Sequence, residues 1–323
     1  MLSTSLKHES RIFPPPGQPP QWIPTTGVMD DQGRPKIKYQ DQEGIDLGAD
    51  EDGKHHIEVA GKQLEVWNDE IEPLQQVGFH WQNYAKAFKM MNGSRASQTR
   101  LEDPTLTLND LKGFWGNLRN TLFICFTTVI GTVLSSALVA YGFARVQFPF
   151  RDGLFLVVLA TMMLPYQVTL IPLFALYSKL GWNGTFAPLI VPYFFGVPFY
   201  IFLLRQFFMG IPEDLSAAAR IDGCSEIGIF TRIILPLSKP ALATTALFMF
   251  LFQWGDFLNP LIYLQDDRQY TLAVALQQFQ SQHESAWGPL MAMSTVITLP
   301  IIVLFFLTQR TFIQGITMSG LKG

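Results

Sequence analysis

Residues 120–144 read NTLFICFTTVIGTVLSSALVAYGFA and contain no charged side chain. A helix needs about 20 predominantly apolar residues to cross the hydrocarbon core of a bilayer, so this stretch is long enough to span it. Four further apolar runs predict spans, at 153–176, 185–208, 241–264 and 289–309. The alternative, a soluble domain that buries all these helices, is disfavoured by their number and length. The sequence therefore predicts an all-α polytopic membrane protein with five transmembrane helices.

The composition of the whole chain agrees with a membrane protein that also has a water-exposed portion. Of the 323 residues, 48% are hydrophobic and 15% are charged, whereas a soluble domain has about 25% charged residues. The net charge of −3 is too balanced for a nucleic-acid-binding protein. Cys125 lies in an apolar run and Cys224 in a polar segment, so a disulfide between them is not expected.

The charged residues are concentrated before Asn120. Residues 1–119 contain 13 basic and 17 acidic residues, whereas residues 120–323 contain 10 and 9. Within the first part, residues 80–92 predict a short amphipathic helix. We interpret residues of about 25–75 as a small β-rich soluble module. Three short runs in it alternate polar and apolar residues and predict β-strands, at 36–39, 56–59 and 63–67.

Basic residues in the loops predict the orientation, because cytoplasmic loops of membrane proteins are enriched in Lys and Arg. The C-terminal tail and the loops on its side of the membrane hold eight of them: Arg145, Arg151, Arg205, Arg220, Arg232, Lys239, Arg310 and Lys322. The loops on the other side hold only Lys179 and Arg268. We therefore expect a cytoplasmic C-terminus and an external region 1–119. Three tryptophans at the outer ends of spans fit an interfacial aromatic belt: Trp115, Trp182 and Trp287.

An external region of this size needs a device that carries it across the membrane. Residues 1–7 lack the basic start and the apolar core of a signal peptide. Either the translocation is unusual, or a first helix is missing from the sequence.

The segment 209–240, between the third and fourth predicted spans, is the most informative part of the chain. Pro212 followed by Glu213 and Asp214 is typical of a helix N-terminus, where acidic side chains face the positive end of the helix dipole. The three alanines 217–219 favour a helix and permit close approach to a partner. Gly223 ends or bends this helix. Four apolar residues then recur at helical spacing before Pro236 and Pro240: Ile227, Phe230, Ile233 and Ile234.

These features predict two short helices at an angle, lying at the membrane face. The alternative is a plain amphipathic connector. The ordered pattern of helix-start, alanine, glycine and apolar residues disfavours it.

This segment resembles the EAA loop of permease subunits of binding-protein-dependent ABC importers. The family pattern is Glu-Ala-Ala, three residues, Gly, nine residues, Ile, one residue and Leu-Pro. The residues that fall at these spacings are Ala218, Ala219, Gly223, Ile233, Leu235 and Pro236. Ala217 stands where the pattern has Glu, and Glu213 and Asp214 lie one turn earlier. Together with Asp222, these are the coupling-loop residues that the resemblance implies.

Further segments resemble the carbohydrate-importer branch of this family, the maltose-type permeases: residues 163–172 (MLPYQVTLIP), 180–185 (LGWNGT), 254–261 (WGDFLNPL) and the tail 309–323. In the third of these, Gly255 replaces an Asn of the family pattern. The resemblance covers about 115–323, and residues 3–7 and 20–24 also resemble the stretch after the family's first helix. Family members have six spans. We therefore expect that the coding sequence starts upstream of Met1 and restores a first helix, with residues 25–75 as an insertion in the first external loop.

The resemblance implies a permease subunit that passes a sugar or sugar-like solute from an external binding protein across the cytoplasmic membrane of a bacterium or archaeon. It implies two ATP-binding subunits, which dock on residues 211–240, and a second permease subunit, for which a different chain is favoured. The alternative is a stand-alone secondary transporter or channel. The spacing of the loop and the absence of charge relays within the spans argue against that alternative.

The residues themselves offer no catalytic site. The sequence has no Gly-x-x-x-x-Gly-Lys-Ser/Thr loop, so ATP hydrolysis is expected on the partner subunits. No cofactor or metal is expected either, since a solvated loop explains His55 and His56 better than a metal site does. Polar residues inside spans usually face a cavity or a partner, which makes six residues candidates for the transport pathway: Tyr166, Gln167, Gln253, Trp254, Asp256 and Asn259. A structural role in helix packing or bending is the alternative for these residues.

Overall fold

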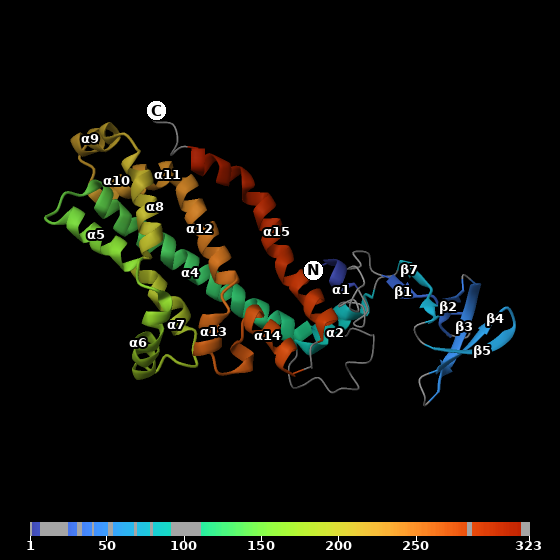
Figure 1. Ribbon diagram of the computed structural model, residues 1–323. Coiled ribbons are helices and arrows are strands. Elements are labelled where there is room, and N and C mark those ends of the chain that lie inside the picture. Colours follow the sequence, from blue (N-terminus) through green and yellow to red (C-terminus); the bar gives the residue numbers. More distant parts are fainter. Residues whose placement is uncertain are drawn as a thin grey trace. The chain divides into compact units, whose positions relative to one another are not determined.

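The computed structural model describes residues 2–6, 25–30, 34–40, 42–50, 54–67, 70–77, 80–91, 111–282 and 286–317. The stretches 20–24 and 318–323, compared above with family segments, lie outside the described residues. The chain divides into two units (Figure 1). One consists of Met1–Asp110 and Phe279–Val296, and the other of Leu111–Gln278 and Ile297–Gly323.

The first unit contains a five-stranded antiparallel sheet in the order β5-β4-β3-β2-β6. Its strands are β2 (Lys36–Tyr39), β3 (Gln42–Ala49), β4 (Lys54–Val59), β5 (Lys62–Trp67) and β6 (Glu72–Pro73). A second, two-stranded sheet pairs β1 (Thr25–Gly27) with β7 (Gln75–Val77). The three predicted strands are confirmed. β3 was not predicted, because its glycines and acidic residues interrupt the apolar alternation that marks a strand.

The sheet is held by a small apolar cluster and by a tight hairpin. Ile37, Ile57, Val59 and Val66 are buried together on one face of the sheet. The turn between β4 and β5 is formed by Ala60 and Gly61, which both have positive φ, at 51° and 76°. This is the two-residue turn whose twist matches that of the flanking strands.

His55 and His56 lie in β4, which confirms the strand predicted for His56 and corrects the solvated loop expected for the pair. His55 contacts Asp46 at 2.9 Å and His56 contacts Asp50 at 2.8 Å.

The first unit also contains the short helices α1 (Leu2–Ser5) and α2 (Gln82–Met90). α2 confirms the predicted amphipathic helix. The Asn83 side chain donates a hydrogen bond to the Ser5 carbonyl at 2.7 Å, and the hydroxyls of Ser5 and Tyr84 lie 3.0 Å apart. These contacts join two segments that are distant in the sequence.

The second unit is helical and is organised around α4 (Leu111–Arg145), a helix of 35 residues. Its other main helices are α5 (Arg151–Thr161), α6 (Tyr166–Lys179), α8 (Pro198–Met209), α12 (Lys239–Trp254) and α13 (Leu258–Tyr263). A 3₁₀ turn, η6 (Asp267–Gln269), comes next, and helices α14 (Leu272–Gln282) and α15 (Trp287–Thr317) follow it. The parts of α14 and α15 within Phe279–Val296 belong to the first unit. A core of buried residues joins α4, α8, α12 and the 209–240 segment, with Ala140, Leu204 and Phe208 fully buried. The small side chains of Ala137 and Ala140 are among the buried contacts of α4 in this core and allow close approach.

Three of the five predicted spans are not single straight helices. In place of one helix at 153–176, α5 and α6 meet at an angle of 94°. Pro165 is extended at the start of α6 and, lacking an N–H, cannot continue α5. In place of one helix at 241–264, α12 ends at Trp254 and α13 begins at Leu258.

The predicted span at 185–208 is also composite. It consists of α7 (Ala187–Ile190), a 3₁₀ turn, η4 (Val191–Phe195), and α8, with Gly196 at a φ of 89° between the last two. Prolines at the starts of these three elements favour this segmentation.

Among the described residues, three helical segments are long and apolar enough to cross a membrane: Leu111–Arg145, Ala187–Met209 and Trp287–Gln309. The total reaches five if each of two bent pairs forms one span. One pair is α5 with α6, and the other joins residues 226–237 to α12 with a bend of 77°.

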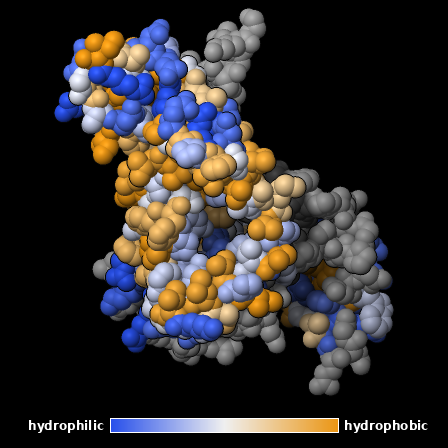
Figure 2. Space-filling model, turned by 90° about the vertical axis from the view of Figure 1, so that its left-hand side faces the viewer, coloured by the Kyte–Doolittle hydropathy of each residue, from blue (hydrophilic) through white to orange (hydrophobic). Residues whose placement is uncertain are grey.

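The surface of the helical unit is largely apolar. Figure 2 shows hydrophilic side chains gathered at the end that carries α9 (Glu213–Ile221), with apolar side chains over much of the surface below it. Side chains such as Leu134, Leu156 and Ile171 are more than half exposed, at 62%, 67% and 74%. Apolar surface of this extent is typical of contact with lipid or with an apolar partner.

Candidate functional site

The 209–240 segment forms short helices at one end of the helical unit (Figure 1). They are α9, α10 (Glu226–Ile229), a π turn, η5 (Phe230–Ile234), and α11 (Leu235–Leu237). As predicted, two short helices meet at Gly223. Pro212 precedes the first helical residue, and Glu213 and Asp214 occupy the exposed first turn of α9, where the helix dipole favours acidic groups.

The turn after α9 depends on Gly223, whose φ is +81°. The N–H of Gly223 bonds to the Arg220 carbonyl at 3.0 Å, and the N–H of Cys224 bonds to the Ala219 carbonyl at 2.9 Å. This pair of bonds is the Schellman motif, in which a residue in the left-handed conformation ends a helix. A Cβ at Gly223 would meet no atom within 4 Å, so the chain itself leaves room beside the turn.

Two apolar side chains flank this turn and point away from the core. Ile221 is 87% exposed and Ile227 is 75% exposed. On α9, Ser216 and Ala219 face the core, and Ala217, Ala218 and Asp222 are exposed. We call Ala217, Ala218, Ile221, Asp222, Gly223 and Ile227 the outer surface of the segment. Ile221 was not singled out from the sequence, although its position two residues after Ala219 places it off the buried face.

The π turn changes which residues after Gly223 are buried. Ile229 and Ile234 are fully buried, Phe230 and Ile233 are half-buried, and Ile227 is exposed. The sequence predicted one regular helical stripe that included Ile227. This is wrong because a π turn adds a residue and shifts the register. Leu235 is half-buried and Pro236 exposed at the start of α11.

Two polar contacts attach the segment to α4, from Arg145 to Ile211 and from Tyr141 to Glu226, and a third binds the end of α8. Arg145 donates to the carbonyls of Phe208, at 2.6 Å, and Ile211. Tyr141 donates its hydroxyl to Glu226 at 2.6 Å. The Arg220 guanidinium donates to the same carboxylate at 2.9 Å, and these hydrogen bonds, that of Arg220 above all, hold the pKa of Glu226 below its ordinary value.

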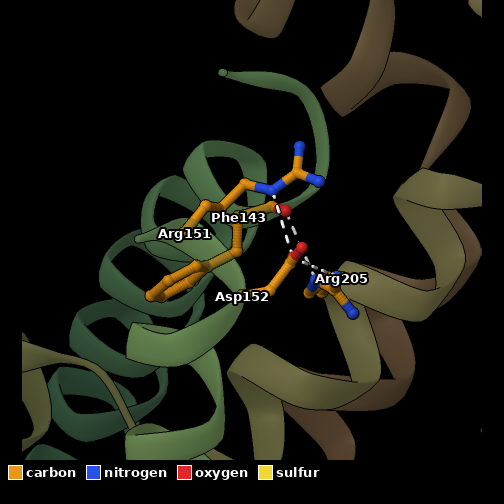
Figure 3. Close-up of polar contacts among 4 residues, drawn as sticks. All are labelled: Phe143, Arg151, Asp152 and Arg205. Atoms are coloured by element: carbon orange, nitrogen blue, oxygen red, sulfur yellow. Dashed lines mark hydrogen bonds and ion pairs between the residues drawn. The ribbon is translucent and has the colours of Figure 1, made fainter. Parts of the chain in front are cut away.

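A neighbouring polar cluster joins α5 to α4 and α8 (Figure 3). Asp152 contacts Arg151 at 3.3 Å and Arg205 at 3.8 Å. Arg205 also donates to the Phe143 carbonyl at 3.3 Å and lies over the Phe155 ring at 4.0 Å. Like Glu226, Asp152 is a carboxylate that pairs with arginine. None of the polar contacts in this cluster involves a residue of the 209–240 segment.

At the opposite end of the helical unit, the structure brings together three of the six candidate pathway residues (Figure 1). Tyr166, at the start of α6, donates its hydroxyl to the Asn259 side chain on α13. The Asn259 amide donates to Asp256 at 2.9 Å, and its backbone N–H lies 3.3 Å from the same carboxylate. Asp256 therefore caps the start of α13, and Tyr166 ties that start to α6.

The other three candidates lie in different surroundings. Trp254 is buried, donates to the Ile297 carbonyl at 3.3 Å and stacks on Phe250. Gln253 is 4% exposed, and its carbonyl oxygen has no hydrogen-bond partner among the described residues. Gln167 is exposed on α6. Within the described part of the chain, no group of three or more His, Cys, Asp and Glu side chains could hold a metal ion.

Comparison with known proteins gives a family match over most of the helical unit. Residues 124–318 match the family described as "Binding-protein-dependent transport system inner membrane component". A crystal structure of a bacterial ABC transporter involved in the import of the acidic polysaccharide alginate is similar in fold. Its TM-score is 0.56 at 22% sequence identity, with 70% of this chain and 89% of that chain covered.

Curated relatives are similar over about two thirds of the chain. The arabinooligosaccharides transport system permease protein AraQ of Halalkalibacterium halodurans is 37% identical over 210 residues, which are 65% of this chain and 75% of the relative. The trehalose/maltose transport system permease protein MalG of Thermococcus litoralis is 38% identical over 69% of this chain and 79% of the relative. The alpha-glucoside transport system permease protein AglG of Rhizobium meliloti is 32% identical over 72% and 66%.

Proposed function

The chain belongs to the family of binding-protein-dependent transport system inner membrane components, and we propose that it is the permease subunit of an ATP-driven importer for a carbohydrate. The family and the apolar helices make it a multi-pass protein of the inner membrane. The names of its relatives support the solute class, since they concern arabinooligosaccharides, trehalose or maltose, and alpha-glucosides.

Two ATP-binding subunits are the proposed partners of the 209–240 segment. The observation that carries this assignment is the pair of exposed isoleucines, Ile221 and Ile227, on either side of a glycine turn that leaves space for a partner. Exposed apolar side chains of this kind are typical of a docking surface. Closure of the ATPases on ATP would displace the segment, and the helices attached to it would rock against a second permease subunit.

The proposed orientation follows from the loop charges. The C-terminus and residues 209–240 face the cytoplasm, and residues 1–119 lie outside, where an external solute-binding protein delivers the sugar. We favour a different chain as the second permease, because the β-rich module near residues 25–75 gives this subunit an asymmetric external part.

The proposed transport pathway runs past Tyr166, Asn259 and Asp256. Hydroxyl, amide and carboxylate groups are the partners that sugar hydroxyls require. The hydrogen bonds of Asn259 with Tyr166 and Asp256 support this proposal, because they keep the three groups together. Gln167 is exposed near Tyr166. Gln253 and Trp254 belong to the buried packing on the adjacent turn of α12.

Affinity purification of the tagged chain from its own membranes in mild detergent tests the proposal. We expect an ATPase subunit and a second multispan protein to be recovered with it. Gly223→Trp should insert into the membrane at the normal level but abolish uptake, because its side chain fills the space beside the turn. Recovery of the chain alone, with transport in vesicles that lack ATP, would instead favour the stand-alone transporter or channel.

A further inference from the structure

Glu226 joins three elements of the helical unit through one carboxylate. Its Oε2 accepts a hydrogen bond from Tyr141 on α4 at 2.6 Å, and its Oε1 accepts one from Arg220 in the last turn of α9 at 2.9 Å. Tyr141 is 85 positions from Glu226 in the sequence and Arg220 only 6. Hydrogen bonds to a charged group are stronger than those between neutral groups. One side chain therefore connects α9, α10 and α4.

The same face of α4 also holds the beginning of α9. Arg145 follows Tyr141 by four residues, so both side chains lie on one face of the helix. Arg145 donates to the carbonyls of Phe208 and Ile211, just before α9 begins. Consequently α4 holds the chain where it enters α9, through Arg145, and where it leaves α9, through Tyr141 and Glu226.

Apolar packing contributes little to holding α9. Its two buried side chains, Ser216 and Ala219, are small, and its large ones, Leu215 and Ile221, are 44% and 87% exposed. Burial of so few methyl groups gives little stabilisation. The polar contacts at its two ends therefore matter more than they would for a helix with a large buried face.

Tyr141 itself is fixed in place. Its side chain is 5% exposed, and its ring lies 4.9 Å from the ring of Phe230. Ile229, beside Phe230, is fully buried in the same core. The tyrosine hydroxyl is consequently a rigid attachment point on α4 for the Glu226 carboxylate.

We propose that Glu226 is a positioning residue for energy coupling, which holds α9 on α4 so that a displacement of α9 moves α4. Without this link, α9 would turn about Gly223 when the ATPase moves, and the displacement would not be transmitted to α4. The inference rests on the proposed function, in which α9 receives the ATPase.

Tyr141→Phe and Glu226→Gln test the link in the purified complex with its ATPase subunits, reconstituted in liposomes. The readout is the amount of sugar transported per ATP hydrolysed, which a general loss of folded protein does not change. We expect this ratio to fall about tenfold in each variant, the factor that one hydrogen bond to a charged group can supply. The double variant should be no worse than Glu226→Gln, because both changes break the same link.

Asp152→Asn is the matched control. This carboxylate, on α5, also joins helices at this end of the unit, through Arg205 on α8 (Figure 3), and its ion pairs with Arg151 and Arg205 involve no residue of the 209–240 segment. It should transport as much per ATP as the wild type. Arg220→Ala should lower the amount of sugar transported per ATP. Arg220→Lys keeps the charge and should restore part of that loss.

A wild-type ratio of transport to hydrolysis in Tyr141→Phe would overturn the inference. That variant keeps the buried ring and loses only the hydroxyl, so it remains informative if Glu226→Gln fails to assemble. If Gly223→Trp uncouples the complex and Tyr141→Phe does not, the positioning role fails and the proposed function stands. If the wild-type chain binds no ATPase, the proposed function fails and this inference with it.

Discussion

Tyr166 on α6 donates a hydrogen bond to Asn259 on α13, joining residues that are 93 positions apart in the sequence. Each residue was a candidate for the transport pathway from the sequence, in separate predicted spans. The bond places them together beside Asp256, which accepts a hydrogen bond from Asn259. Two broken spans thus meet through polar side chains at the points where their helices begin.

Tyr166→Phe should change sugar affinity more than stability. A hydrogen bond between membrane helices contributes only about 0.6 kcal/mol on average, so the variant should remain folded. Loss of a hydroxyl that contacts a sugar should raise the KM for uptake about tenfold, since it leaves a polar partner unpaired. The measurement is uptake against sugar concentration.

Asn259→Ala is the companion variant for this contact. Its effect on KM should not add to that of Tyr166→Phe, because each change removes the same pair. Unchanged KM values in both variants would exclude these side chains from the pathway and leave them a packing role.

Substitutions at Gly223 should separate backbone strain from docking. Gly223 has a φ of +81°, and a left-handed conformation costs a residue with a Cβ about 1–2 kcal/mol. Asn adopts this conformation more readily than Ala, so Gly223→Asn should be more stable than Gly223→Ala by thermal unfolding in detergent. Uptake should fall with side-chain size instead, from Ala to Asn to Trp. A ranking of uptake that follows stability would contradict a docking role for this turn.

Ile221→Ser and Ile227→Ser should weaken binding of the ATPase and leave the isolated chain unaffected. Both side chains are mostly exposed, at 87% and 75%, so their loss costs the folded chain little. Burying an isoleucine contributes about 1.5–3 kcal/mol, so each change should weaken binding by about tenfold or more. The measurement is the amount of ATPase subunit that stays bound to the tagged chain during purification, at several protein concentrations in detergent.

Thr231→Ser serves as the control for these two variants. Thr231 is exposed on the same segment, and its hydroxyl bonds back to the Ile227 carbonyl at 2.8 Å, a contact that Ser can keep. Equal ATPase retention in all three variants would show that the outer surface does not bind the ATPase.

The Glu226 contacts predict a specific dependence of stability on pH. Hydrogen bonds from Arg220 and Tyr141 hold the pKa of Glu226 below its ordinary value. A carboxylate with a lowered folded-state pKa stabilises the protein above its unfolded pKa, about 4.3 for Glu, and loses this effect as the pH falls through the folded value. The stability difference between wild type and Glu226→Gln should therefore be constant from about pH 8 to about pH 5 and shrink below about pH 4. Thermal unfolding of both proteins in detergent measures it, and a difference that grows on acidification would contradict the assignment.

Elements that are determined by residues close together in the sequence were predicted from local patterns. Apolar runs located the membrane helices, the alternation at 36–39 located a strand, and Gly223 located the turn after α9. The break near Pro165 could have been predicted, since proline cannot continue a helix through its N–H. A long apolar run masked this signal.

Contacts between distant segments could not be predicted in this way. Tyr141 lies in an apolar helix, and nothing near it indicates a bond to Glu226, 85 positions further along the chain. Likewise, the burial of Ile229 in place of Ile227 follows from a π turn, which the spacing of apolar residues does not reveal. Such features depend on how the helices pack.

Sugar uptake by the purified complex in liposomes tests the central claim most directly. We expect labelled oligosaccharide to accumulate only when ATP is supplied on the side of the 209–240 segment and the solute-binding protein on the other. Gly223→Trp should abolish this uptake in complexes that still assemble. Uptake by this chain alone, at the same rate with and without ATP, would contradict the account.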